Sequence, residues 1–168
     1  MNLKKSLVAF MMMAFVAFSA TAQEKASPAK TAEGIAAGSK ITINYSSPAV
    51  KGRTIWGDLV PLGQVWRAGA DDATTFTTEK DIMVEGKKLP AGTYSFFIIP
   101  GETESTLIFN KVAKQWGAYT YDAKEDALRV SVPSLQTSTM EERLVYEVKP
   151  DGFEVRWEYG KAAAKIGS

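Results

Sequence analysis

The chain has 168 residues, with 20 lysines and arginines against 19 aspartates and glutamates, and it contains neither cysteine nor histidine. Without these two residue types, disulfides, Ser-His-Asp and Cys-His catalysis, and zinc sites built on His or Cys are excluded. A formal net charge of +1 provides no basic surplus for gripping nucleic acid, so no nucleic-acid partner is expected.

The N-terminus has the pattern of a secretory signal peptide. Lys4 and Lys5 precede an apolar run from Leu7 to Phe18, and Ala20-Thr21-Ala22 is an A-x-A cleavage site. The apolar run is too short to cross about 30 Å of hydrocarbon comfortably. We therefore expect residues 1–22 to be cleaved, which leaves an exported chain, periplasmic or extracellular, without a membrane span.

The mature chain is expected to consist of a flexible leader, residues 23–39, and a single β domain, residues 40–168. The leader is rich in Ala, Lys, Glu and Ser and has almost no large apolar residue. Such a segment cannot bury enough surface to offset the entropy lost on ordering. The remainder is long enough to bury a core without disulfides.

The first half of the domain shows strand-like patterns. Lys40–Ser46 alternates apolar and polar residues, which predicts a half-buried strand. Residues 82–84 and 87–89 flank Glu85-Gly86, the pattern of a hairpin with a tight turn. Tyr94–Ile99 is apolar on both faces, so we expect a central strand that is covered on both sides.

The second half continues the alternation. The segments that show it are residues 106–111, where Leu107 and Phe109 are expected to face inward, 128–132, 144–148 and 153–159. In the last segment, Phe153, Val155, Trp157 and Tyr159 are expected to face the core and Arg156 the solvent. The tail, Gly160–Ser168, is weakly patterned. Roughly eight to ten short strands, and no helix beyond the signal, predict an all-β fold, either an antiparallel β-sandwich or a jelly-roll-like barrel.

One stretch, Arg53–Phe76, concentrates residues that can both pack and bind. Arg53 and Arg67 each lie near a tryptophan in the sequence. Two guanidinium groups beside an indole such as Trp66 can clamp a carboxylate, sulfate or phosphate. The alternative is structural, in which the arginines donate to loop carbonyls or pair with neighbouring aspartates such as Asp71.

Two further groups carry candidate chemistry. Asp71 and Asp72 could bind Ca²⁺ or act as a general acid or base, or simply cap a turn. No further acids lie at the spacing of a calcium loop, so neither a metal nor a cofactor is predicted. Trp116, Tyr119 and Tyr121 could form an aromatic platform for sugar rings or apolar ligands, unless they pack into the core.

Several linked motifs resemble one protein family. They are SP-x-x-KGR (47–53), G-x-LVP-x-G-x-VWR-x-GA-x-x-ATTF (57–76), G-KKLPAGTYS-F (86–96), IFNK (108–111) and QWG-x-Y-x-YD-x-x-x-D-x-LRV (115–130). Together they are similar to domain of unknown function family 2911, whose members are exported bacterial proteins. The resemblance implies an exported, mostly β domain and no established activity, substrate or cofactor.

These patterns favour a module that binds a small anionic or sugar ligand, a glycan, or a partner in the cell envelope. The candidate ligand-binding residues are Arg53, Trp66, Arg67, Asp71, Trp116, Tyr121 and Arg129. A carboxylate-based hydrolase acting on a glycan or envelope polymer is a second hypothesis, and a structural accessory domain is a third. The sequence leaves open whether the protein is an enzyme.

Overall fold

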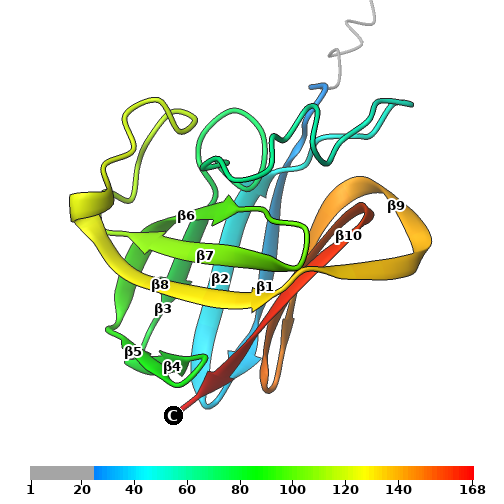
Figure 1. Cartoon of the computed structure of the whole chain (residues 1–168). Helices are drawn as coiled ribbons and strands as arrows, with labels where there is room; N and C mark the ends of the chain where they lie inside the picture. Colours follow the sequence, from blue (N-terminus) through cyan, green and yellow to red (C-terminus); the bar gives the residue numbers. More distant parts are fainter. Residues whose placement is uncertain (1–24) are drawn as a thin grey trace, which may run out of the picture.

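The structure is a computed structural model that describes residues 25–168, which form ten strands in two antiparallel sheets (Figure 1). The elements are β1 (Ala29–Ala36), β2 (Ser39–Ser46), β3 (Thr75–Thr78), β4 (Ile82–Val84), β5 (Lys87–Leu89), β6 (Gly92–Ile99), β7 (Glu104–Asn110), η1 (Ala123–Glu125), β8 (Asp126–Pro133), β9 (Leu135–Lys149) and β10 (Gly152–Gly167). One sheet has the strand order β1-β2-β3-β6-β7-β8 and the other β5-β4-β10-β9. The prediction of an all-β sandwich is confirmed.

The main core lies between the two sheets, and each of the ten strands contributes a buried side chain to it. Phe153 of β10 connects the layers, with ring centroids 5.1 Å from Phe76, 5.7 Å from Phe96 and 6.4 Å from Phe109. Aromatic rings at these separations bury a large apolar area and add edge-to-face attraction. The sandwich is therefore held together by aromatic packing across the sheet interface.

Strand β6 is central, as predicted, and is covered on both faces. Phe96 points into the main core, whereas Phe97 lies on the opposite face in a smaller cluster with Ala73 and Ile108. Tyr121 covers this second cluster, with its ring centroid 5.1 Å from that of Phe97. Loops, rather than a third sheet, therefore bury the outer face of β6.

Other strand predictions are also confirmed. The hairpin of β4 and β5 has the predicted bounds, and β2 covers the predicted Lys40–Ser46. Leu107 and Phe109 of β7 are buried in the main core. Because these segments alternate cleanly or turn at Glu85-Gly86, local sequence is enough to define them.

The expected flexible leader is wrong for Ala29–Ala36, which form β1. This strand pairs with β2 along its whole length and packs on β9. The approach is close, because a Cβ on Gly34 would lie 2.9 Å from Val148 Cγ1. Backbone pairing and small side chains stabilise β1 without a buried large apolar side chain, since its Ile35 is 60 % exposed. The predicted signal peptide, residues 1–22, lies outside the described residues.

Strand β10 also corrects the sequence analysis. The weakly patterned tail continues the strand to Gly167, with Ala162, Ala164 and Ile166 buried on one face. Small alanines conceal this alternation, since they carry little apolar signal.

A β-bulge at Glu158 breaks the expected alternation within β10. The register with β9 shifts on either side of Glu158, whose φ is +53°. The extra residue turns the following side chain outward, so Tyr159 is 50 % exposed and does not face the core. On the other face, Arg156 is largely covered and makes ion pairs with Glu141, Glu147 and Glu154, so its predicted exposure to solvent is wrong.

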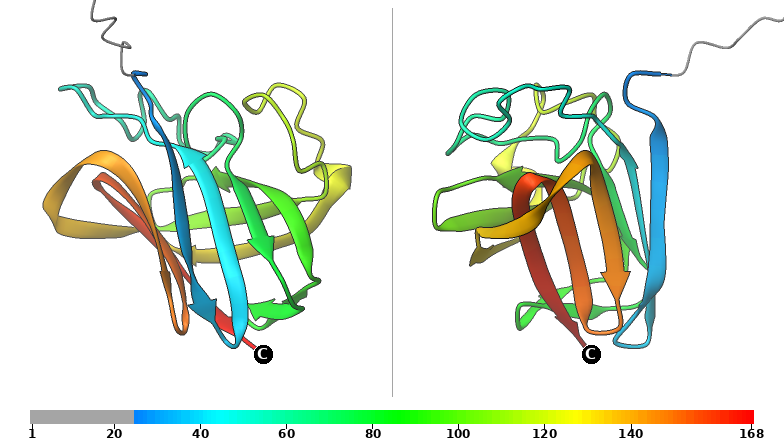
Figure 2. Two further views of the ribbon diagram at one scale, coloured as in Figure 1. Left: turned by 180° about the vertical axis from the view of Figure 1, so that it is seen from behind. Right: turned by 90° about the vertical axis from the view of Figure 1, so that its right-hand side faces the viewer.

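Two long irregular segments gather at one end of the sandwich. Residues 47–74 and 111–122 lie at the end opposite the β4–β5 hairpin (Figures 1 and 2). This loop end carries most of the side chains that the sequence analysis selected as candidates.

No helix within residues 25–168 has the length and apolar character needed to cross a membrane.

Candidate functional site

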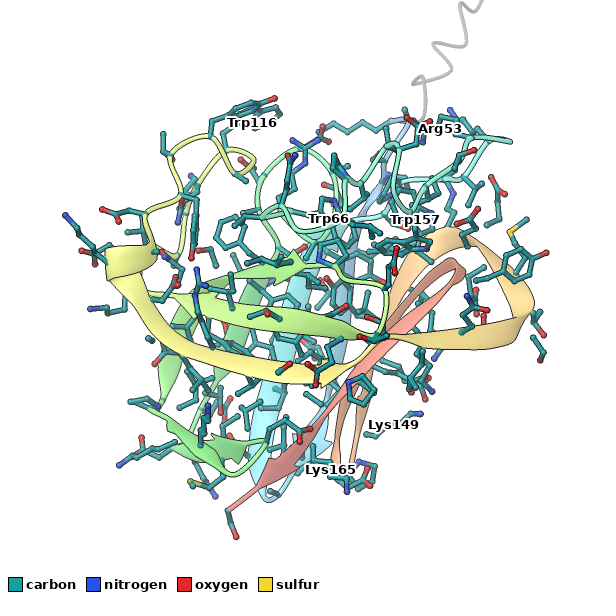
Figure 3. All side chains as sticks on the ribbon, viewed as in Figure 1. Arg53, Trp66, Trp116, Lys149, Trp157 and Lys165 are labelled. Carbon is teal, nitrogen blue, oxygen red and sulfur yellow. The ribbon has the colours of Figure 1, made fainter. Side chains whose placement is uncertain are left out.

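The loop of residues 47–74 is anchored to β6 by Trp66. The Trp66 amide donates to the carbonyl of Ile98 at 2.8 Å, and the Ile98 amide donates back at 2.9 Å. The Trp66 ring stacks on Trp157, with centroids 5.9 Å apart and an interplanar angle of 15° (Figure 3). Trp66 thus joins the loop to both sheets.

The chain reverses immediately after Arg67, at the buried residue Ala68. Ala68 has φ +55°, in the left-handed region that non-glycine residues rarely adopt. Its carbonyl accepts two hydrogen bonds, from Thr74 Oγ1 at 2.9 Å and from Tyr146 Oη at 2.6 Å. Burial raises the pKa of Tyr146, so its hydroxyl remains a donor. These two bonds hold the turn that directs Arg67.

A groove of about 630 Å³ opens beside this turn. Its charged lining residues are Lys51, Arg53, Arg67 and Asp71, and its exposed or half-buried aromatic residues are Trp66 and Tyr119. We call it the cationic groove because three basic groups face one carboxylate. Its volume lies within the range of roughly 300–1,000 Å³ that is usual for small-molecule sites.

Arg53 is held at the mouth of the cationic groove by its own loop. Its Nε donates to the carbonyl of Val50 at 3.0 Å, and its Nη2 donates to that of Ala49 at 2.5 Å. The preceding Lys51 has φ +48° and places a second basic side chain at the same edge. Part of the Arg53 guanidinium therefore satisfies loop carbonyls, while the residue stays exposed.

Arg67 lies deeper and makes little contact with polar atoms. Its one side-chain hydrogen bond within the described residues is a long one, from Nε to the carbonyl of Gly69 at 3.4 Å. Its guanidinium and the ring of Tyr119 both lie beside Gly117, where a Cβ would be 3.2 Å from Arg67 Nη1 and 3.0 Å from that ring. Gly117 has φ +58°, so both its backbone and its surroundings favour glycine.

Within the part of the chain that the structure describes, neither arginine has a carboxylate partner. Across residues 25–168, no ion pair involves Arg53 or Arg67, although Asp71 lines the same groove. Partly buried charges are usually paired, because leaving water costs them hydration. The carbonyl contacts of the structural alternative are present for Arg53, but the predicted aspartate pairing is not.

Four of the seven candidate residues thus lie in the cationic groove, and three lie elsewhere. Trp116 is 58 % exposed and does not line it, and Figure 3 places it across the loop end from Arg53. Tyr121 and Arg129 form a separate cluster around Asp126. Tyr121 Oη and Arg129 Nε each donate to Asp126 Oδ2 at 2.6 Å, and Arg129 Nη2 donates to Tyr121 Oη at 2.6 Å.

The sequence analysis missed residues that shape the site. Lys51 is one, although its place beside Arg53 in the KGR motif was a signal. The buried amides of Asn110 and Gln115 are others: Gln115 Nε2 donates to Asn110 Oδ1 at 3.1 Å and to Ser95 Oγ at 3.1 Å. This network fixes the loop that brings Tyr119 to the groove. Within the described chain, no group of three acidic side chains could hold a metal ion.

Comparison with known proteins gives one match. The family model described as "Protein of unknown function (DUF2911)" matches residues 27–166. No curated protein and no solved structure matches the chain.

Proposed function

Because the chain belongs to the DUF2911 family, whose description names no activity, we propose from the geometry that it is a binding module for a small anionic ligand. The ligand class is a carboxylate, sulfate or phosphate, including sugar acids, and the site is the cationic groove. The observation that carries the proposal is the pair of arginines, Arg53 and Arg67, that line one groove without a carboxylate partner among residues 25–168.

The character of the groove supports this proposal. A guanidinium presents a planar set of donors that matches carboxylate and phosphate oxygens. Tyr119, which is 83 % exposed, and Trp66 add flat apolar surfaces on which the body of a ligand can pack. Lys51 adds charge that favours the approach of an anion.

Backbone strain around the groove supports it further. Lys51, Ala68 and Asp71 all have positive φ, between +48° and +58°, although none is glycine. Such conformations persist only where the surrounding structure imposes them, and they cluster at functional sites. Here they hold the basic side chains at the groove in the absence of a ligand, which lowers the cost of ordering on binding.

The same lining favours binding over hydrolysis. A glycoside hydrolase usually requires two carboxyl groups about 5–10 Å apart. Asp71 is the one acid among the residues that line the cationic groove.

Replacing Arg67 with glutamine is expected to abolish ligand binding while leaving the fold nearly intact. Arg67 makes one long hydrogen bond and no ion pair within residues 25–168, so the thermal midpoint should move by less than about 3 °C. The parent should be stabilised by at least one anion from a panel of phosphate, sulfate, citrate and glucuronate, since a ligand of the folded state raises the midpoint. Differential scanning fluorimetry measures both effects.

Glucose is the neutral control for glucuronate. Arg129→Gln is the control variant, because Arg129 lies outside the cationic groove. This variant should keep the full ligand-induced rise in the thermal midpoint. Loss of that shift in Arg129→Gln but not in Arg67→Gln would move the site to the Tyr121 cluster. A large drop in the thermal midpoint of Arg67→Gln, together with no ligand-induced shift in the parent, would support a structural role for Arg67 instead.

We further propose that the protein acts outside the cytoplasm, on the basis of the signal-like N-terminus. Intact-mass measurement of protein recovered from the periplasm or medium of an expressing bacterium should show a chain beginning at Gln23. A chain that keeps Met1 and stays with the membrane fraction would contradict the cleavage.

A further inference from the structure

A second cavity adjoins the stacked tryptophans and is separate from the cationic groove. It has a volume of about 550 Å³, and Trp157 lines both cavities. Its walls come from the end of β6 and the following turn, the start of β9, and the bend of β10 (Figure 1). We call it the apolar cleft. The proposal below does not rest on the function of the cationic groove.

The floor of the apolar cleft is part of the main hydrophobic core. Ile98 and Val155, both buried, line it beside Trp157. At its rim, Leu62 is 39 % exposed and Leu135 is 44 % exposed, although both are large apolar side chains. A cavity of this size with an apolar floor and exposed apolar sides favours a ligand with an apolar body.

The charges at the rim are acidic. Glu102 and Glu158 line the cleft, and neither forms an ion pair or a side-chain hydrogen bond with another residue in the described part of the chain. Lys161 is the one basic residue of the lining, and its Nζ is already 2.8 Å from a carboxylate oxygen of Glu154. The cleft therefore offers two carboxylates that have no cation partner among residues 25–168.

Glu158 lies at the bulge in β10, opposite another acidic residue. Its φ of +53° is imposed by the bulge in β10, and its pairing partner across the hairpin is another acid, Glu141. Glu141 is already paired with Arg156, at 3.3 Å from its Nε. Glu158 is therefore the acid of this pair that keeps its charge without a cation partner among residues 25–168.

From these observations we propose that the apolar cleft binds an organic cation with an apolar body, that is, a hydrophobic amine. The apolar body lies on Ile98 and Val155, and the ammonium group lies at the rim between the carboxylates of Glu102 and Glu158. Trp56 and Tyr159 also line the cleft, and their ring faces attract a cation. The apolar floor favours any ligand with an apolar body. The two carboxylates at the rim attract a cation and repel an anion, so they favour an amine over a fatty acid or a neutral lipid.

The test uses three ligands that share an eight-carbon chain: octylamine, octanol and octanoate, each at pH 7 and below its solubility limit or micelle concentration. At this pH octylamine is a cation, because alkylammonium groups titrate near pH 10.4. Titrations are followed by tryptophan fluorescence, to which Trp56 and Trp157 contribute from the cleft wall. Octylammonium is expected to bind about tenfold more tightly than octanol, and octanoate more weakly than either.

The variants Glu102→Gln and Glu158→Gln should each weaken octylammonium binding about three- to tenfold and leave octanol binding unchanged. Glu104→Gln is the matched control, because Glu104 is an exposed acid two residues from Glu102 that does not line the cleft. Glu102 is exposed, so its variant should fold even if Glu158→Gln does not.

Equal affinities of the parent for octylammonium and octanol would overturn the proposal, as would a preference for octanoate. So would the absence of saturable binding by all three ligands, or an equal effect of Glu104→Gln. Arg67→Gln should leave octylammonium binding unchanged. The test of the apolar cleft can therefore succeed or fail independently of the test of the cationic groove.

Discussion

Replacing Trp157 with alanine is expected to lower the free energy of unfolding by about 3–5 kcal/mol. Trp157 is 2 % exposed, stacks on Trp66 and meets the ring of Trp56 at a centroid distance of 6.2 Å. Removing the indole leaves a cavity where β10 meets the anchored loop, and that cavity cannot collapse without moving both. Equilibrium unfolding in urea, followed by far-UV circular dichroism, measures the loss.

Two comparisons sharpen this test. Tyr159→Ala should cost less than about 1 kcal/mol, because Tyr159 is 50 % exposed beyond the bulge. Trp157→Phe should recover much of the loss, since the buried indole N–H of Trp157 has no hydrogen-bond partner among the residues described. Equal and small losses for Trp157→Ala and Tyr159→Ala would contradict the placement of β10.

Replacing Glu154 with glutamine is expected to cost about 2–4 kcal/mol at neutral pH. Glu154 is 4 % exposed and lies beneath three basic side chains. Its Oε2 accepts from Lys149 Nζ at 2.7 Å and lies 2.8 Å from Lys161 Nζ, and its Oε1 accepts from Arg156 Nη1. A neutral amide would leave these three half-buried cations without the anion that they share.

The same cluster predicts a specific loss of stability in acid. Burial alone would raise the pKa of Glu154, but hydrogen bonds from Lys149, Lys161 and Arg156 outweigh it and lower that pKa to about 2. Its ordinary value is 4.5, so folding favours the ionised form. This contribution is complete above about pH 5 and is lost as the pH falls through 4.5 toward 2.

Unfolding free energies measured from pH 7 down to pH 2 should therefore fall more steeply for the parent than for Glu154→Gln. Glu79→Gln removes an exposed acid that is in no ion pair within residues 25–168, and it should follow the parent. Parallel profiles for the parent and Glu154→Gln would show that the cluster does not depress the pKa of this carboxyl group.

The strands that sequence predicts correctly are those whose side chains carry a local signal. The Glu85-Gly86 turn defines its hairpin, and the two apolar faces of Tyr94–Ile99 require a central position. Strand β1 gives no such signal, because backbone pairing and the close approach of Gly34 to Val148 stabilise it. The bulge at Glu158 is equally hidden, since it depends on register with β9 rather than on residue type.

Only part of the candidate site could be predicted from the sequence. Arg53, Trp66, Arg67 and Asp71 come from one loop, so their proximity follows from their closeness in sequence. Which aromatic of the second loop would join them depends on contacts between distant segments, such as the donation of the Gly117 amide to the Asp71 carbonyl at 3.2 Å. That contact brings Tyr119 to the groove and leaves Trp116 and Tyr121 outside, a distinction that no local pattern carries.

The stacked pair of Trp66 and Trp157 has a thermodynamic consequence. Trp66 lines the cationic groove, and Trp157 lines both that groove and the apolar cleft. A ligand that shifts this common wall changes the shape offered to a ligand on its other side. Linkage then requires each occupant to alter the dissociation constant of the other by the same factor. If the two proposed ligands bind, an anion and a hydrophobic amine are expected to act as heterotropic effectors of each other through Trp157, the residue that lines both cavities.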